Sequence, residues 1–185
     1  MVDIALLVTI TSVIFSALGV SVVLKDYIAS VLAGVIMRHV KQIKPNRRIK
    51  ILTIPTIKGD VVKIGLVRTS LIEVGDGERL PSVQTGRILN IPNFMVLNNP
   101  VLVYGETIID EVIAYLSWPH PDLDKVIGDM REAIQSQDLR VIEVGLYQRK
   151  DKLVVHGIFE SKTHEVTDVR SNILKEFLQK QQTVE

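Results

Sequence analysis

The chain has 185 residues, with 22 Lys and Arg against 21 Asp and Glu, a formal net charge of +1 and no cysteine. This length suits one domain or two small ones with a core of useful size. The balanced charge excludes a general polyanion binder, and the lack of cysteine excludes disulfide scaffolds, thiolate metal sites and thiol nucleophiles. The mean hydropathy is +0.25 although only 46% of the residues are hydrophobic, which indicates that apolar residues are concentrated in one segment.

That segment is residues 4–24, which carry no charged side chain. As an α-helix with a rise of about 1.5 Å per residue, they extend roughly 30 Å, the thickness of the hydrocarbon core of a bilayer. We therefore predict a transmembrane helix over residues 1–24. Two alternatives stay open. One is a signal peptide, although the sequence lacks its basic start and A-x-A cleavage site, and the other is a buried helix of a soluble core.

Small residues recur at four-residue spacing within this span, in the pairs Ser12–Ser16 and Ala17–Ser21. Such faces let helices approach closely in lipid, which favours self-association of the span. The alternative is that the hydroxyl groups bond to carbonyl groups of their own helix and indicate no partner.

Lys25 and Asp26 end the uncharged run, and Asp26 is a suitable N-cap for a second helix that begins at Tyr27. Apolar residues then recur at three- and four-residue spacing, which predicts an amphipathic interfacial helix over residues 25–46. Pro45 and Asn46 are expected to end this helix. Its apolar stripe consists of Ile28, Val31, Leu32, Val35, Ile36, Val40 and Ile43.

Basic residues without any acid lie between residues 38 and 50. Under the positive-inside rule they predict a cytoplasmic C-terminal side and an N-terminus outside. Anionic lipid headgroups are the favoured partner; a nucleic-acid patch is the alternative, but interleaved aromatic residues are missing. This membrane-surface basic collar consists of Arg38, Lys41, Lys44, Arg47 and Arg48.

Two compact domains are predicted after the helices. Residues 47–105 are short runs rich in Val, Ile, Leu and Thr between glycines and prolines, typical of a small antiparallel β-barrel or sandwich, with a hairpin turn at residues 75–78. Residues 106–185 read as a strand, a helix, two strands and a helix, over residues 111–118, 122–136, 141–148, 152–160 and 166–181. This order predicts a split βαβ-type (ferredoxin-like) α+β domain with both helices on one face. The expected fold class is thus a membrane protein ordered α, then β, then α+β.

No motif in the sequence indicates catalysis. There is no phosphate loop, nucleophile elbow or HExxH sequence. Asp122 and Asp124 are interpreted as carboxylates favoured by the dipole of the helix that they begin. We expect no enzyme activity, no cofactor and no metal site, because the four histidines are scattered; they are His39, His120, His156 and His164.

Several motifs occur in an order that resembles the small-conductance mechanosensitive channel family (MscS-like). A helix rich in small residues is followed by a break, an amphipathic helix and a basic exit, and the likeness covers roughly residues 12–180. Order and spacing are more specific than any single motif. The short motifs are Ala33-Gly34, a strand opening with Gly59 and leading to Thr69, and Ile91-Pro92-Asn93.

The resemblance implies a homo-oligomer, usually of seven chains, in a prokaryotic inner membrane, in which the span lines a pore for ions and small osmolytes that opens under tension. Apolar side chains one turn apart would seal the pore by dewetting. The β domains would form a ring, and the α+β domains a cage that filters ions. Transferred to this sequence, the seal falls on Leu18 and Val22, helix packing on Ala17, Gly19 and Ser21, and the kink and pore exit on Lys25 and Asp26.

The resemblance is incomplete at the N-terminal side, which leaves two alternatives open. Members of the family carry at least two further spans before the pore helix, and the sequence has none before residue 4. A separate membrane subunit that supplies such helices is one alternative. The other is a single-span, membrane-anchored scaffold that conducts nothing.

Overall fold

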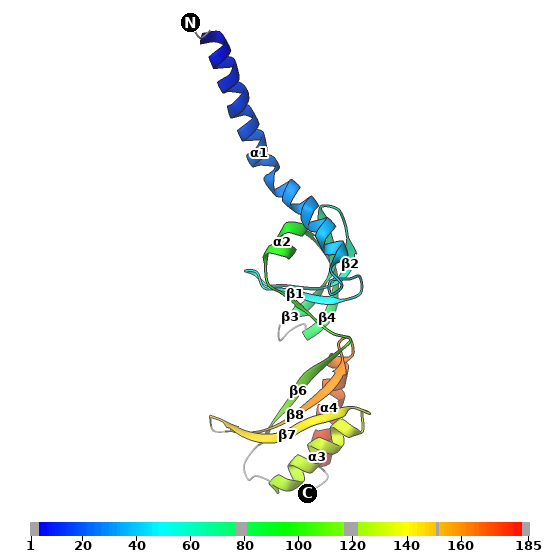
Figure 1. Cartoon of the computed structure of the whole chain (residues 1–185). Coiled ribbons are helices and arrows are strands. Elements are labelled where there is room, and N and C mark those ends of the chain that lie inside the picture. Colours follow the sequence, from blue (N-terminus) through cyan, green and yellow to red (C-terminus); the bar gives the residue numbers. More distant parts are fainter. Residues whose placement is uncertain (1–3, 77–80, 117–121, 151, 183–185) are drawn as a thin grey trace. The chain divides into compact units, whose positions relative to one another are not determined.

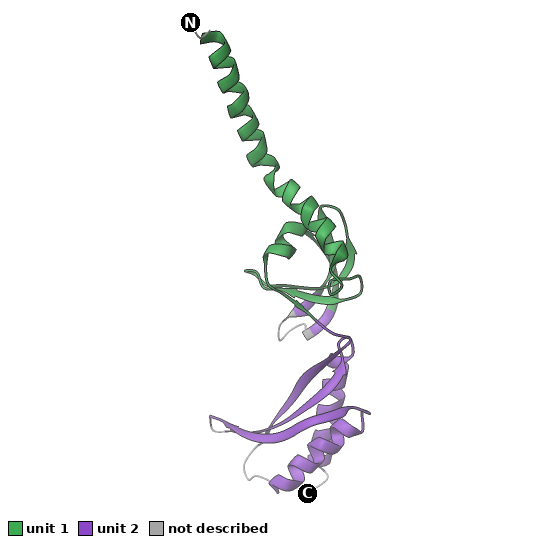
Figure 2. Ribbon diagram, viewed as in Figure 1, with its two compact units in different colours: residues 1–73, 84–103 green, residues 74–83, 104–185 purple. Residues whose placement is uncertain are grey.

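The computed structural model describes residues 4–76, 81–116, 122–150 and 152–182. It divides into two compact units (Figure 2). Unit 1 comprises Met1–Glu73 and Gln84–Val103, and unit 2 comprises Val74–Val83 and Tyr104–Glu185. The predicted hairpin turn at residues 75–78 and the residues Trp118 and His120 lie wholly or partly outside the described residues.

Helix α1 (Ile4–His39) opens unit 1 and is followed by a five-stranded sheet of order β4-β3-β2-β1-β5 (Figure 1). The pairs β1–β2, β1–β5 and β2–β3 are antiparallel. The short helix α2 (Asn93–Asn98) connects β4 to β5. The strands are β1 (Arg48–Ile51), β2 (Ile57–Ile64), β3 (Arg68–Asp76), β4 (Pro81–Pro92) and β5 (Val101–Val103).

The C-terminal part of α1 contributes to the core of unit 1. Met37 of α1 is fully buried together with apolar side chains of the strands and of α2. Burial of this kind stabilises a fold by roughly 1.5–3 kcal/mol for each large apolar side chain. The core residues are Met37, Ile43, Ile49, Ile51, Val61, Leu71, Ile91 and Val96.

The predicted small antiparallel β domain is present as one five-stranded sheet, and the described strands β1 to β5 all belong to it. One local expectation is wrong, because residues 95–104 were predicted as β-rich. Residues 93–98 form α2, and only Val101–Val103 form a strand. The consecutive apolar residues there do not alternate, and Pro92 precedes the helix, a position where its missing N–H has no cost.

The expected break in the first helix is also absent, since α1 runs without interruption through Lys25 and Asp26. Neither residue breaks a helix by itself: lysine is a good helix former, and there is no proline at this point. If Asp26 were the N-cap of a second helix, the backbone hydrogen bonds that continue α1 through this point would be lost. The helix ends at His39, before the predicted end, and Pro45-Asn46 lies in the turn that leads into β1, with Asn46 at a φ of 66°.

Unit 2 is the predicted α+β domain. Its strands are β6 (Thr107–Leu116), β7 (Arg140–Arg149) and β8 (Lys152–Lys162), in the order β6-β8-β7, and its helices are α3 (Leu123–Gln135) and α4 (Val166–Gln182). Because β8 is antiparallel to both neighbours, β6 and β7 run parallel on either side of it. A βαβ unit with a third strand inserted between its strands is the split arrangement that the sequence predicted.

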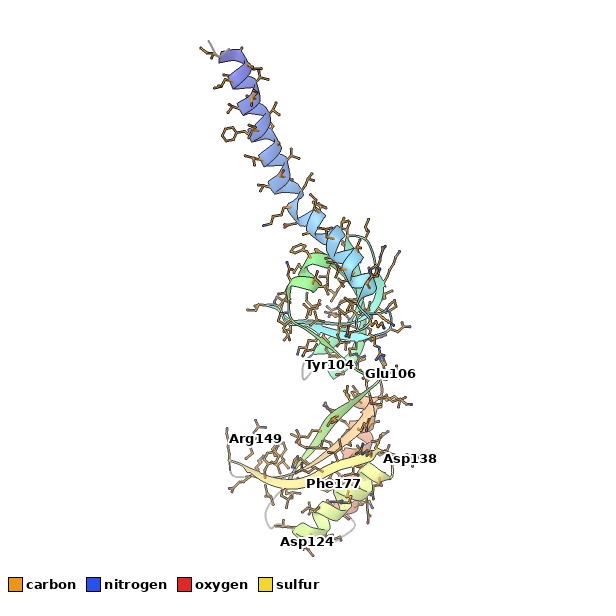
Figure 3. All side chains as sticks on the ribbon, in the orientation of Figure 1. Tyr104, Glu106, Asp124, Asp138, Arg149 and Phe177 are labelled. Carbon is orange, nitrogen blue, oxygen red and sulfur yellow. The ribbon has the colours of Figure 1, made fainter. Side chains whose placement is uncertain are left out.

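Both helices of unit 2 contribute to one core against the sheet. Phe177 of α4 (Figure 3) and Phe159 of β8 are fully buried there. Gly157 lets α3 approach the sheet closely, because a Cβ at this position would lie 2.5 Å from Ile134 Cδ1. The predicted role of Asp122 is confirmed, since its carboxylate accepts a hydrogen bond from the backbone N–H of Asp124 at 3.0 Å.

Candidate functional site

Helix α1 is the candidate functional element, because its apolar surface is uncovered. Among the described residues it alone is long and apolar enough to cross a membrane, and no residue of its most apolar part is buried. Its side chains project with no other element beside them along the N-terminal part of the helix (Figure 3). No core of the described chain covers the uncharged part of this helix, so the prediction of a span is favoured over that of a buried helix.

The C-terminal part of the same helix is anchored in unit 1. The span is therefore continuous with a segment that ends at His39 and buries Met37 in the core. Cleavage within the uncharged run would cut a helix that the folded unit uses, which argues against a signal peptide.

The residues predicted to seal a pore lie on one face of α1. Leu18 and Val22 are four residues apart, hence one above the other, and their exposed fractions are 57% and 75%. Gly19 lies beside them, and nothing would approach a Cβ there within 4 Å. The structure thus leaves this face free for another molecule, while its role in a pore stays a prediction.

Four hydroxyl groups of the span bond within their own helix. Ser21 donates to the carbonyl oxygen of Ala17 at 2.8 Å. Three further hydroxyl groups donate to the carbonyl four residues earlier at the same distance, those of Thr9, Thr11 and Ser12. These groups need no partner helix, so the case for self-association depends on the apolar and small side chains.

The two charged residues at the end of the uncharged run are exposed. Lys25 and Asp26 lie within the continuous helix rather than at a kink. Neither side chain has an ion-pair or hydrogen-bond partner among the residues that the structure describes.

The amphipathic part of α1 packs against the rest of unit 1 through three small residues and one large apolar residue, Met37. Ser30, Ala33, Gly34 and Met37 are the buried residues of α1. Most of the predicted stripe faces outward: Ile28, Leu32, Val35 and Ile36 are exposed. One face of this part of α1 is therefore covered by other residues of the same chain. Its opposite, apolar face is not covered by any described residue of the chain.

Asn93 holds α1 against the sheet. Its side chain is fully buried, and its amide nitrogen lies 2.9 Å from Leu66 O, 3.1 Å from Gly65 O and 3.3 Å from Ser30 O. Its carbonyl oxygen accepts a hydrogen bond from the Thr69 hydroxyl at 2.7 Å. One side chain thus joins α1, the β2–β3 turn and the start of β3, and we call these residues the Asn93 cluster.

Gly34 permits this attachment. A Cβ at Gly34 would lie 2.2 Å from the carbonyl oxygen of Leu66 and 2.5 Å from Asn93 Nδ2. Backbone atoms cannot move aside as a flexible side chain would, so only glycine fits at this contact. The sequence motifs around Ala33-Gly34, Thr69 and Ile91-Pro92-Asn93 therefore meet in one place, which their spacing did not reveal.

The structure corrects one residue of the predicted basic collar. Arg48 is buried, with 4% of its side chain exposed, and its Nε lies 2.8 Å from Asp60 Oδ1. Gln84 also donates to Asp60, at 2.7 Å. Arg48 is therefore an internal ion-pair residue of β1 and cannot face lipid headgroups, whereas Arg38, Lys41 and Lys44 are exposed and Arg47 is half-buried.

The described residues contain no group of three or more His, Asp or Glu that could hold a metal ion. His156 Nδ1 lies 2.9 Å from Glu111 Oε1 on the neighbouring strand, and the His156 ring meets that of Tyr147 edge-on at 5.4 Å. This arrangement orients one histidine on the surface of a sheet and brings no second ligand or nucleophile to it.

Comparison with solved structures identifies the fold. The closed-state crystal structure of Helicobacter pylori MscS matches with a TM-score of 0.71 and 20% identity, over 90% of this chain and 64% of that one. Two structures of Arabidopsis thaliana MSL1 match with TM-scores of 0.64 and 0.62 and identities of 14% and 16%, over 92% and 96% of this chain and 61% of theirs. No family model matches the chain, and no curated protein matches its sequence.

The chain therefore has an MscS-like fold, in the predicted order of a long apolar helix, a β unit and an α+β unit. It spans less than two thirds of the length of each of these solved chains.

Proposed function

We propose that this chain is the pore-forming subunit of an MscS-like mechanosensitive ion channel. The observation that carries the proposal is the uncovered apolar helix α1, continuous with an MscS-like β unit. In this proposal several copies, seven by analogy with the family, surround a pore that passes ions and small osmolytes when membrane tension rises. The membrane is a prokaryotic inner membrane, with the N-terminus outside and both units in the cytoplasm.

The physical reasoning starts from the unpartnered surface of α1. A helix that is apolar all round needs lipid or other helices on every side, and a ring of copies provides lipid outside and helix neighbours on two sides. The fourth side then lines the pore. Leu18 and Val22, exposed and one turn apart, would form two apolar rings that exclude water and block ions without a plug.

Charge supports the proposed orientation. Arg38, Lys41 and Lys44 are exposed immediately after the span and have the anionic surface of the cytoplasmic leaflet as their proposed partner. A separate membrane subunit that supplies tension-sensing helices is compatible with this arrangement. We propose no role in nucleic-acid binding or catalysis.

Two measurements on the full chain test the proposal. Electron microscopy in nanodiscs should give ring-shaped particles with cyclic symmetry, and patch-clamp recording of reconstituted liposomes should give currents that appear with suction. Val22→Ser should hydrate the proposed seal and lower the opening tension, while Val8→Ser, at another exposed valine nearer the N-terminus, should change it less.

Each alternative to the proposed channel predicts a different outcome of these measurements. Monomeric or dimeric particles would contradict the proposal and favour the membrane-anchored scaffold, because one or two helices cannot enclose an ion pathway. Rings that conduct only after a co-purified membrane protein is added would assign tension sensing to that separate subunit. Symmetric rings without conductance at any tension would contradict the channel function itself.

A further inference from the structure

A pocket of about 240 Å³ lies within unit 1, beside the turn of α1 that follows the uncharged run. Its lining includes Asp26 and Tyr27 of α1, Arg68 at the start of β3 and Phe94 of α2. Pockets for drug-sized molecules have volumes of roughly 300–1,000 Å³, so this one suits a smaller group.

The two charges of the pocket are opposite in sign and remain unpaired. Asp26 and Arg68 line the same space, yet they form no ion pair with each other, and neither side chain has another partner among the residues described in unit 1. An occupant that satisfies both must carry a negative and a positive group. A simple anion would satisfy Arg68 and be repelled by Asp26.

The position of the pocket indicates where such an occupant comes from. The uncharged run ends at Leu24, so the next turn, with Asp26 and Tyr27, lies at the level of the lipid headgroups if α1 crosses the bilayer. Tyrosine is enriched at this level because its ring is apolar and its hydroxyl group is polar. The occupant is therefore a part of a lipid rather than a solute from the bulk.

We propose that this pocket binds the headgroup of a zwitterionic phospholipid, one that carries a phosphate and an ammonium group. The Arg68 guanidinium binds the phosphate through paired N–H donors. The Asp26 carboxylate binds the ammonium group, and the nearby rings of Tyr27 and Phe94 add cation–π attraction. This site is separate from the exposed basic collar, which attracts anionic lipids without selecting a headgroup.

The inference depends on α1 crossing a membrane, and on no other part of the proposed function. Native mass spectrometry of the full chain in mild detergent tests it. Phosphatidylethanolamine and phosphatidylglycerol with the same acyl chains are added in equal amounts. The wild-type chain should bind phosphatidylethanolamine about tenfold more tightly, the value of one charge-assisted contact.

Variants assign the contacts. Asp26→Asn should remove the preference for phosphatidylethanolamine, and Arg68→Gln should weaken binding of both lipids about tenfold, with partial recovery in Arg68→Lys. Lys63→Gln removes an exposed charge from β2 outside the pocket and should change nothing. Equal binding of both lipids by the wild type, or a preference that survives Asp26→Asn, would overturn the proposal.

A further arm separates the lipid from a soluble source of the same chemistry. Free phosphoethanolamine that displaces the lipid at equal concentration would overturn the lipid assignment. The same spectra report the number of chains in each particle. A monomer that selects phosphatidylethanolamine would contradict the channel but not the pocket, and a ring without selection would do the reverse.

Discussion

Replacing Asn93 by alanine tests whether the Asn93 cluster holds helix α1 to the sheet of unit 1. The substitution removes the acceptor for the Thr69 hydroxyl and the donor for the Leu66 carbonyl, which are bonded at 2.7 and 2.9 Å. It also removes the longer contact to Ser30 of α1, at 3.3 Å. Because Asn93 and Thr69 are fully buried, water cannot easily replace the lost partners.

The expected cost follows from the number of polar groups left without a partner. Each buried group that loses its hydrogen bond costs about 1–3 kcal/mol, so the two groups together weaken the attachment by about 2–6 kcal/mol. Hydrogen exchange in the C-terminal third of α1 and in the β2–β3 turn should then accelerate by a factor of about 30 to 20,000. Asn93→Asp should be at least as severe, because a carboxylate cannot donate to the carbonyl oxygens.

Hydrogen exchange with mass spectrometry on the full chain in detergent measures this effect by segment. Asn90→Ala is the matched control, since Asn90 accepts a hydrogen bond from the Ser70 hydroxyl at 2.6 Å on the exposed side of the same sheet. Because water can replace that partner, Asn90→Ala should change the free energy of local opening by less than about 0.5 kcal/mol. Equal acceleration in both variants would refute the reasoning, and so would acceleration confined to β4.

Three further predictions follow from close contacts and charges. Gly34→Ala should lower the free energy of unfolding by about 1–3 kcal/mol, because its Cβ would meet backbone 2.2 Å away, whereas Gly19→Ala should be neutral or stabilising; thermal unfolding by circular dichroism compares them. Asp60→Ala leaves the buried arginine of β1 uncompensated and should cost about 3–5 kcal/mol in the same assay; a smaller loss than for Gly34→Ala would contradict this. The hydrogen bond from Lys180, followed by its charge, holds the pKa of Glu132 below the ordinary value of 4.5. This pair therefore stabilises unit 2 above about pH 4.5, and its contribution is lost as the pH falls through the lowered pKa. Lys180→Met should return the pKa toward 4.5 in an NMR titration, and an unchanged pKa would contradict the assignment.

The sequence predicted unit 2 well because its signals are local. Helix α3 was expected over residues 122–136 and occupies Leu123–Gln135, since Asp122 supplies a cap and apolar residues recur with the helical period. The strands β7 and β8 are rich in β-branched residues and are separated by only two residues, which makes their antiparallel pairing predictable. Here each short segment contains the information that determines its own structure.

Unit 1 was harder to predict from the sequence, because the contacts that determine its structure join residues far apart in the chain. Asn93 contacts Ser30, which lies 63 positions earlier in the chain, and Arg48 pairs with Asp60 on the adjacent strand. By sequence alone, any basic residue that follows a transmembrane span is interpreted as one that contacts lipid headgroups. Only the fold reveals that Arg48 faces inward, where the carboxylate compensates its charge.

The small residues of α1 illustrate the same limit and divide the helix into two parts. Small-xxx-small spacing occurs both before Lys25 and after it, as in Ala29–Ala33 and Ser30–Gly34, and by sequence alone either stretch suits close helix packing. In the structure the β2–β3 turn and Asn93 of the same chain pack against the second stretch, which includes Ser30 and Gly34. Self-association through small residues is therefore left to the first stretch, around Ala17 and Gly19, where nothing covers the helix. Ser30 is the first buried residue of α1, so the uncovered part of the helix ends just before it. This is where Asp26 and Arg68 line the proposed lipid pocket, so a bound headgroup would favour those angles between α1 and the sheet that keep both side chains in contact with it.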